Sequence, residues 1–192
     1  VIKNDTFMYC DSLTSVTIPD SVTSIGYAAF YLCTSLTDIT IPDSVMFISY
    51  GAFYGCSSLT SITIPDGVKE ITADVLYACR SLTSVSIEGS VTIISSGAFY
   101  GCSSLTSITI PDSVTSIGKD AFSDCDLLEF NEYDNGLYLG SKTNKYLALI
   151  KPKTQEIEDI SINAECKIIG GGVFSACTSL TSITILDGVT SI

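Results

Sequence analysis

The side chains with the most evident chemistry are cysteines that recur at one position of a repeating unit. Seven of the eight belong to this series, and Cys166 lies outside it; the seven are Cys10, Cys33, Cys56, Cys79, Cys102, Cys125 and Cys177. Such thiols can form disulfides, as in extracellular proteins, or pack as small apolar groups. In-register parallel strands lie about 4.8 Å apart, wider than the roughly 3.8 Å between the Cβ atoms of a disulfide. The spacing therefore favours a ladder of free thiols. Zinc is disfavoured because the chain has no histidine and no C-x-x-C pair.

Tyrosines form a second series, in four consecutive repeats, each directly after a phenylalanine or leucine expected in the core: Tyr31, Tyr54, Tyr77 and Tyr100. Neighbouring residues point in different directions, so we expect these rings to be outside the core. Amphipathic rings are favoured at binding surfaces, and Tyr27 and Tyr50 extend this candidate patch. The alternative is that the rings stack on one another and shield the edge of each repeat.

Hydroxyl side chains form a third series, at positions that alternate with aliphatic residues and so face away from the core. Its members are Ser15, Thr17, Asp38, Thr40, Ser61, Thr63, Ser84, Ser86, Ser107 and Thr109. They predict a flat, hydroxyl-rich sheet face that could bind a protein or a glycan. A solvated face of residues with good strand propensity explains the pattern equally, and a regular hydroxyl grid is also typical of ice-binding arrays.

Acidic residues recur at the turn of the repeat: Asp20, Asp43, Asp66, Asp112 and Asp187. Calcium prefers such oxygen ligands, but no D-x-D-x-D-G loop is present, and the ability of aspartate to bond its own backbone in turns accounts for the series. Histidine, the usual general base, is absent, as are G-x-S-x-G, P-loop and dinucleotide motifs. We expect no enzyme activity, no cofactor and no metal.

These series belong to a unit of 23 residues that begins at Leu13, Leu36, Leu59, Leu82 and Leu105, and resumes at Ile157 and Leu180. With Leu13 as position 1, aliphatic residues at positions 1, 4 and 6 predict a first short strand. Pro-Asp predicts a turn, and Val22 and Ile25 represent a second apolar pair and a second strand. The unit closes with Ala-Phe-x-x-Cys, as at Ala29–Cys33. A fixed period of this length predicts a mainly β solenoid over residues 1–192, with parallel strands stacked in register.

The repeat is irregular over residues 128–156. Within this segment, residues 136–140 and 145–150 are strand-like, and Ser141–Asn144 joins them, which predicts a β-hairpin insertion. The hairpin either projects from the stack or lies along its edge. The segment 128–156 holds Lys142, Lys145, Lys151 and Lys153, four of the nine basic residues.

The composition limits the partners. The chain carries 9 basic and 21 acidic side chains, for a net charge of −12. Nucleic acid and polybasic contact with a membrane surface are therefore disfavoured. No apolar run approaches the roughly 20 residues of a membrane-spanning helix, so we expect no membrane insertion in this segment. Neither end carries a polar cap, which a solenoid needs, so we expect a fragment of a longer array.

The pattern L-x-x-[VI]-x-I-P-x-x-V-x-x-I-x-x-x-A-F-x-x-C resembles the BspA-like, or Treponema-type, leucine-rich repeats. The departures are local: Leu76 replaces the phenylalanine, and Glu88-Gly89 and Asn163-Ala164 replace Pro-Asp. The resemblance implies a right-handed stack of coils in an extracellular or cell-surface protein that binds host or microbial proteins or glycans. A passive spacer that displays another domain is the alternative. The family has no shared catalytic residues, and the sequence leaves the oligomeric state open.

Overall fold

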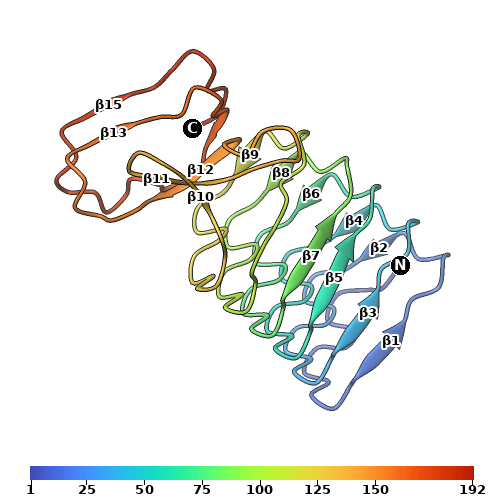
Figure 1. The fold of residues 1–192 in the computed structure, drawn as a ribbon. Coiled ribbons are helices and arrows are strands. Elements are labelled where there is room, and N and C mark those ends of the chain that lie inside the picture. The colour runs from blue at the N-terminus through green and yellow to red at the C-terminus, as the bar shows by residue number, and fades with distance from the viewer.

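The computed structural model describes residues 1–192 and contains strands and turns but no helix. Each repeat forms one coil of a solenoid, and we number the coils from coil 1 at Leu13 to coil 8 at Leu180, with the irregular segment 128–156 as coil 6. Most coils begin with a short first strand, and Figure 1 shows the first strands of coils 1–4 side by side. The first strands are β1 Ser15–Thr17, β3 Asp38–Thr40, β5 Ser61–Ile64, β7 Ser84–Ile87, β13 Asp159–Ser161 and β15 Ser182–Thr184.

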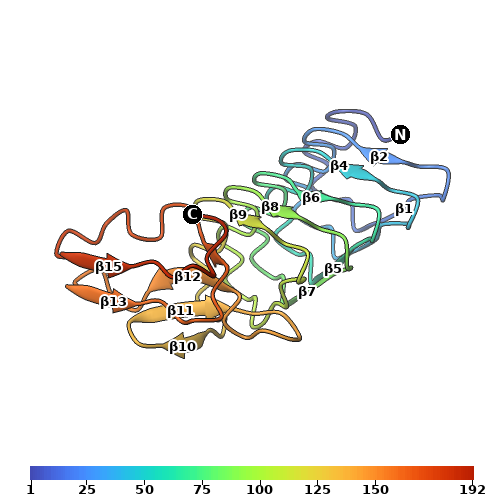
Figure 2. The ribbon, with the colours of Figure 1, turned by 90° about the horizontal axis from the view of Figure 1, so that it is seen from above.

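A second strand of two residues follows the turn in each regular coil and lies on a different side of the stack (Figure 2). These strands are β2 Ser24–Ile25, β4 Phe47–Ile48, β6 Glu70–Ile71, β8 Ile93–Ile94, β9 Ser116–Ile117 and β14 Ile168–Ile169. Pairing is parallel, and between regular coils each partner lies one period away, as in Ser61↔Ser84 and Glu70↔Ile93. The predicted mainly β solenoid with a 23-residue period is therefore confirmed.

The core consists of the repeated aliphatic and aromatic positions. Leu59, Ile64 and Phe99 represent these positions and are 0–2% exposed. Phenylalanine rings of neighbouring coils stack face to face, with centroids 5.3 Å apart for both Phe30–Phe53 and Phe99–Phe122. The main hydrophobic cluster contains 42 buried residues and runs through the coils, so burial of one coil depends on its neighbours.

The cysteines are free thiols. The thiol groups of Cys56, Cys79 and Cys102 lie in the core and donate to backbone carbonyls of the preceding coil at 3.1–3.3 Å. Burial raises the pKa of Cys33 to about 11 and that of Cys125 to about 12. The predicted ladder of free thiols is confirmed, and the buried members from Cys33 to Cys125 pack in the core as protonated groups.

The closing turn of coils 1–5, positions 14–21, is fixed by two residues in the left-handed region of φ, at positions 16 and 20. In coil 2 these are Gly51 (φ 60°) and Gly55 (φ 68°), whereas coil 3 uses Asp74 (φ 51°) and Ala78 (φ 57°). This conformation turns alternate backbone N–H groups toward the next coil. The closing turns thereby stack as a backbone hydrogen-bonded row.

Coil 6 contains the insertion, whose strands are β10 Asn131–Tyr133, β11 Gly136–Leu139 and β12 Ala148–Pro152. The predicted hairpin is present as β11 and β12, which pair antiparallel, and β10 adds a further strand that the sequence did not indicate. β12 also pairs in parallel with β14, so the insertion is part of the stack. Beyond it, β13 and β15 are displaced from the row of first strands in coils 1–4 (Figure 1). A second cluster of eight buried residues, which includes Tyr138, forms this end of the core.

Candidate binding groove on the first-strand face

The hydroxyl series lies where the sequence predicts it. All ten positions are exposed, and parallel register places Ser15 beside Asp38, Thr17 beside Thr40, and Ser61 beside Ser84. Strand alternation produces this face, because Ile62 and Val85 between the hydroxyl residues are buried. The ten side chains therefore share one continuous surface.

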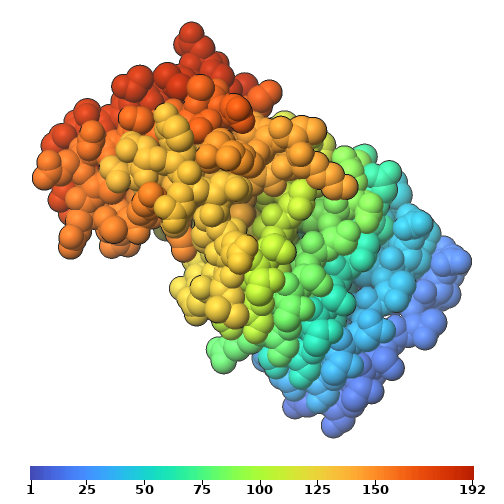
Figure 3. Space-filling model, viewed as in Figure 1, coloured from blue at the N-terminus to red at the C-terminus, as the bar shows by residue number.

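Part of this face is hollowed into a groove of about 620 Å³ across coils 3, 4 and 5. Five residues of the hydroxyl series line it: Ser61, Thr63, Ser84, Ser86 and Thr109. The joining loop of the insertion closes one side of the groove through Ser141 and Lys142. In Figure 3 the orange part of the insertion lies against the green coils. Ser107 and the residues of coils 1 and 2 share the face but do not line the groove.

The insertion is attached to this side of the groove by hydrogen bonds. The Ile110 N–H donates to the Gly140 carbonyl at 2.9 Å, and the Thr143 hydroxyl lies 2.9 and 3.0 Å from the two carboxylate oxygens of Asp112. Hydrogen bonds from Ser141 and Thr143 lower the pKa of Asp112. Asp112 therefore remains ionised near the groove while it holds the loop in place.

Charged groups at the rim of the groove give it a defined polarity. Glu88 accepts a hydrogen bond from the Ser86 hydroxyl at 3.1 Å, and Lys142 is exposed on the opposite side. The groove thus combines a row of hydroxyls with two carboxylates and one ammonium group. Such a surface can satisfy a polar ligand through several hydrogen bonds and a small number of charged contacts.

Sequence reasoning did not single out Glu88, Gly89 or Lys142 as groove residues. A signal was present, because Glu88-Gly89 replaces the Pro-Asp turn and Lys142 lies in the loop of the predicted hairpin. What the sequence could not provide was the contact between the insertion loop and coil 5. That contact joins Asp112 and Thr143, which are 31 positions apart, and brings Lys142 to the same groove as Glu88.

The tyrosine series forms a separate surface, on the closing turns. Tyr31, Tyr54, Tyr77 and Tyr100 stack in sequence with centroids 4.7, 4.6 and 4.6 Å apart and are each half-buried. Because the ring faces contact one another, mainly ring edges and hydroxyls meet solvent. Tyr27 and Tyr50 stack at 5.7 Å nearby, each 45% exposed.

Two of these hydroxyls have carboxylate partners. Tyr50 donates to Asp74 at 2.8 Å, which raises the pKa of Tyr50 to about 12. A hydrogen bond to Asp124 likewise raises the pKa of Tyr100 to about 12. The tyrosine surface therefore has an acidic border, and the structure does not join it to the groove.

The turn aspartates stay apart from one another. No three His, Cys, Asp or Glu side chains gather in a group that could hold a metal ion. No helix is long and apolar enough to cross a membrane.

Comparison with known proteins decides the family. The model of the BspA type leucine rich repeat region matches six copies over residues 1–129 and 152–192. The chain belongs to this family. The gap in the match falls on the insertion, in agreement with its irregular structure. No curated protein sequence matches the chain.

Solved structures agree with this assignment. A leucine-rich cell surface protein from Faecalibacterium prausnitzii is 37% identical over 100% of this chain and 54% of its own length, with a TM-score of 0.67. A leucine-rich repeat protein from Treponema pallidum is 30% identical over 94% of this chain and 71% of its own, with a TM-score of 0.68. One from Bacteroides ovatus is 32% identical over 100% of this chain and 55% of its own, with a TM-score of 0.56. This BspA-type chain thus spans about half the length of the Faecalibacterium and Bacteroides proteins, and no catalytic family is among its matches.

Proposed function

We propose that this BspA-type chain is a recognition module of a secreted or cell-surface protein, and that it binds an extracellular protein or glycan in the groove on its first-strand face. The observation that best supports this proposal is the groove itself, which is lined by five exposed hydroxyl residues of the repeat and by the loop of the insertion. The family assignment and the cell-surface description of the Faecalibacterium relative support the location. Adhesion to host or microbial partners is the activity that follows.

The shape and polarity of the groove support this assignment. Its volume of about 620 Å³ is within the usual range of ligand sites, and its lining is mostly polar side chains. Outward-facing strand residues are also free to change without disturbing the core, because only the alternate positions are buried. The groove is therefore a surface on which partner specificity can reside independently of fold stability.

The test is a binding screen of the purified chain against arrayed extracellular-matrix proteins, plasma proteins and glycans, with and without calcium. The affinity for a saturable, competable hit is then measured for two variants. Ser86→Trp places a large ring inside the groove, whereas Ser15→Trp places the same ring on the same face outside it. We expect Ser86→Trp to weaken binding at least about tenfold, or about 1.4 kcal/mol, and Ser15→Trp to bind as the wild type does.

Two outcomes would contradict the proposal. If Ser86→Trp binds normally but replacement of Tyr31, Tyr54, Tyr77 and Tyr100 with serine abolishes binding in a folded protein, the tyrosine surface is the site. If the folded chain binds nothing, a passive spacer becomes the better description of residues 1–192.

A further inference from the structure

Backbone hydrogen bonds join the closing turns of successive coils in a constant pattern. In coil 4, the N–H groups of Gly97, Phe99 and Gly101 donate to the carbonyls of Lys119, Ala121 and Ser123 in coil 5, at 3.0, 2.9 and 2.9 Å. Coils 1, 2 and 3 donate from the same positions, 16, 18 and 20. Each regular closing turn thus presents three donors to the next coil and three acceptors to the previous one.

Coil 6 breaks this pattern because it has no closing turn. β12 ends at Pro152, and the chain then passes through residues 153–156 directly into coil 7. The N–H groups of Asp120, Phe122 and Asp124 in coil 5 consequently have no hydrogen-bond acceptor in the protein. Phe122 is only 2% exposed. Buried backbone N–H groups are almost always paired, so the Phe122 N–H requires an explanation, whereas Asp120 and Asp124 are exposed residues whose N–H groups can bond water. We call these three N–H groups the donor row.

The opposite wall has the complementary polarity. The closing turn of coil 7 should offer acceptors at positions 15, 17 and 19, and the carbonyls of Gly171, Val173 and Ser175 accept no hydrogen bond. The two walls touch at their start, since a Cβ on Gly171 would lie 2.7 Å from the Lys119 nitrogen, and then separate. Between them is a cleft of about 270 Å³ lined by residues 117–118, 120–123, 150–155, 170–173 and 175–177.

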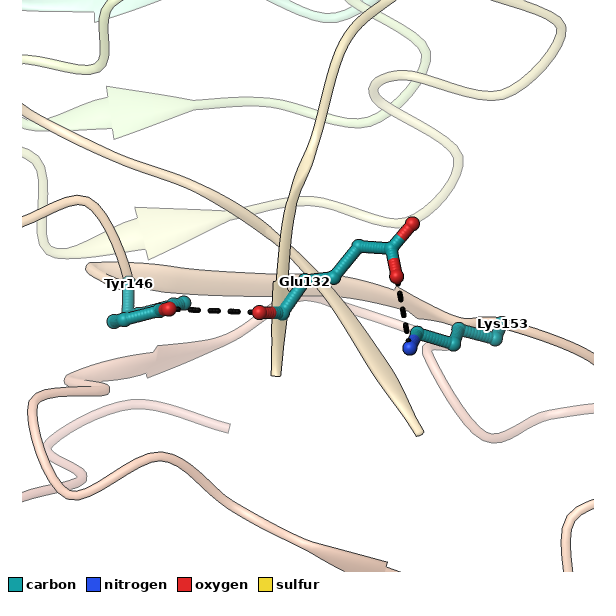
Figure 4. Close-up of polar contacts among 3 residues, drawn as sticks. All are labelled: Glu132, Tyr146 and Lys153. Atoms are coloured by element: carbon teal, nitrogen blue, oxygen red, sulfur yellow. Dashed lines mark hydrogen bonds and ion pairs between the residues drawn. The ribbon is translucent and has the colours of Figure 1, made fainter. Parts of the chain in front are cut away.

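The rim of the cleft is formed by the segment that follows β12. Lys153 forms an ion pair with Glu132 at 2.9 Å, and the Tyr146 hydroxyl lies 3.5 Å from the Glu132 carbonyl (Figure 4). The Lys151 ammonium lies 4.9 Å from the centroid of the Phe130 ring. Both lysines are therefore engaged with the insertion, which fixes the outer edge of the cleft.

We propose that this cleft binds the main chain of a peptide in the conformation of the closing turn that coil 6 lacks. Beyond the point where the walls touch, the peptide carbonyls accept from the N–H groups of Phe122 and Asp124, and its N–H groups donate to the carbonyls of Val173 and Ser175. A ligand with alternating donors and acceptors satisfies both walls, and a polypeptide backbone is such a ligand. A simple anion satisfies only the donor row and faces three carbonyls and the Asp120 carboxylate. This site lies on the closing turns and does not depend on the function proposed for the first-strand groove.

The probe is a synthetic peptide with the sequence of residues 95–104, which contains the closing turn of coil 4, with Cys102→Ser. Amide hydrogen exchange of the full chain is followed by NMR. Without peptide, we expect the Phe122 amide to exchange faster than the Phe99 amide, because only Phe99 has an acceptor. At a free peptide concentration of about ten times Kd, exchange at Phe122 and Asp124 should slow about tenfold, since only the free fraction exchanges.

Two matched variants locate the site. Ser175→Trp places a ring in the cleft, at a position where four regular coils carry tyrosine, whereas Thr178→Trp lies on the exposed chain just outside the cleft. Peptide protection should be lost in Ser175→Trp and kept in Thr178→Trp. The proposal is overturned if Phe122 is as protected as Phe99 before peptide is added, or if the peptide leaves the Phe122 and Asp124 amides unchanged. It is also overturned if inorganic phosphate protects them equally.

Discussion

Gly101→Ala and Ala78→Gly are reciprocal substitutions at one position of the repeat, and together they isolate the energy of its left-handed backbone. Both residues occupy position 20 in neighbouring coils, with φ of 70° for Gly101 and 57° for Ala78. Both are half-buried. A Cβ on Gly101 would lie 3.6 Å from the nearest atom, the Ala78 Cα, which is ordinary van der Waals contact. The substitution therefore changes the backbone preference without creating a clash.

The expected magnitude follows from two opposing terms. Alanine in the left-handed region costs about 1–2 kcal/mol, and alanine reduces the entropy of the unfolded chain by about 0.4–1 kcal/mol relative to glycine. Gly101→Ala should therefore lower the free energy of unfolding by about 0.5–1 kcal/mol. Ala78→Gly should raise it by a similar amount. Gly55→Ala should cost more than Gly101→Ala, because its new methyl group would overlap the Leu32 Cδ2 atom.

The assay is urea unfolding of the three variants and the wild type, followed by circular dichroism and by tyrosine fluorescence. Coincident transitions and equal m-values are required, because repeat proteins can lose two-state behaviour. A change of 1 kcal/mol corresponds to about 2–4 °C in Tm for a chain of this size. If Ala78→Gly destabilises the chain, or if Gly101→Ala is neutral, the left-handed geometry at position 20 carries no such cost and the reasoning is wrong.

Three further predictions concern the core, the thiols and high pH. Phe53→Ala should lower the free energy of unfolding by about 3–5 kcal/mol. Phe53→Leu should lower it by less than about 1.5 kcal/mol, because leucine already fills the same position in coil 3, at Leu76. Equal losses of the two variants in urea unfolding would contradict this expectation. Iodoacetamide should alkylate the exposed Cys10 in the native chain. It should alkylate Cys33 only after urea unfolds the protein, because Cys33 is buried and its pKa is raised to about 11. Mass spectrometry measures the order of labelling, and simultaneous labelling of the two thiols would refute this prediction. The pKa of Tyr50 is raised to about 12 by its hydrogen bond to Asp74, so the unfolded chain releases this proton first and stability should fall as pH rises from 10 to about 12. Tyr50→Phe should show a shallower fall in urea unfolding over this range, and an unchanged slope would show that the bond to Asp74 does not contribute.

The regular coils could be predicted from the sequence because each position has one physical task. Aliphatic residues at positions 1, 4 and 6 must face the core, and the intervening hydroxyls then face outward. The backbone geometry of the closing turns was harder to predict. In coils 2 and 4 the left-handed positions hold glycines, which indicate positive φ: Gly51, Gly55, Gly97 and Gly101. Coil 3 has Asp74 and Ala78 at these positions, and neither residue type predicts positive φ. Stacking against the neighbouring coils holds these residues in the left-handed region, although their intrinsic backbone preference is for negative φ.

The groove and the cleft could not be predicted, because both arise from contacts across the insertion. A loop at Ser141–Lys142 completes one wall of the groove, and the absence of a closing turn after Pro152 opens the cleft. Neither contact has a local pattern in the sequence. β10 is a similar case, because the residues of Asn131–Tyr133 form a strand through their antiparallel pairing with β11.

Regular coils are poor at distinguishing partners, because each presents nearly the same side chains at the same 23-residue interval. Specific recognition requires groups that occur once and that are held in place by the fold. The insertion creates such groups on two sides of the stack: it places Lys142 at the groove, and it leaves the Phe122 N–H of coil 5 unpaired at the cleft. A solenoid is stabilised coil by coil through nearest-neighbour interfaces, so one interface can be irregular while the rest remain intact. We therefore expect substitutions next to coil 6 to change binding more than equivalent substitutions in coils 1 and 2, at equal cost in stability.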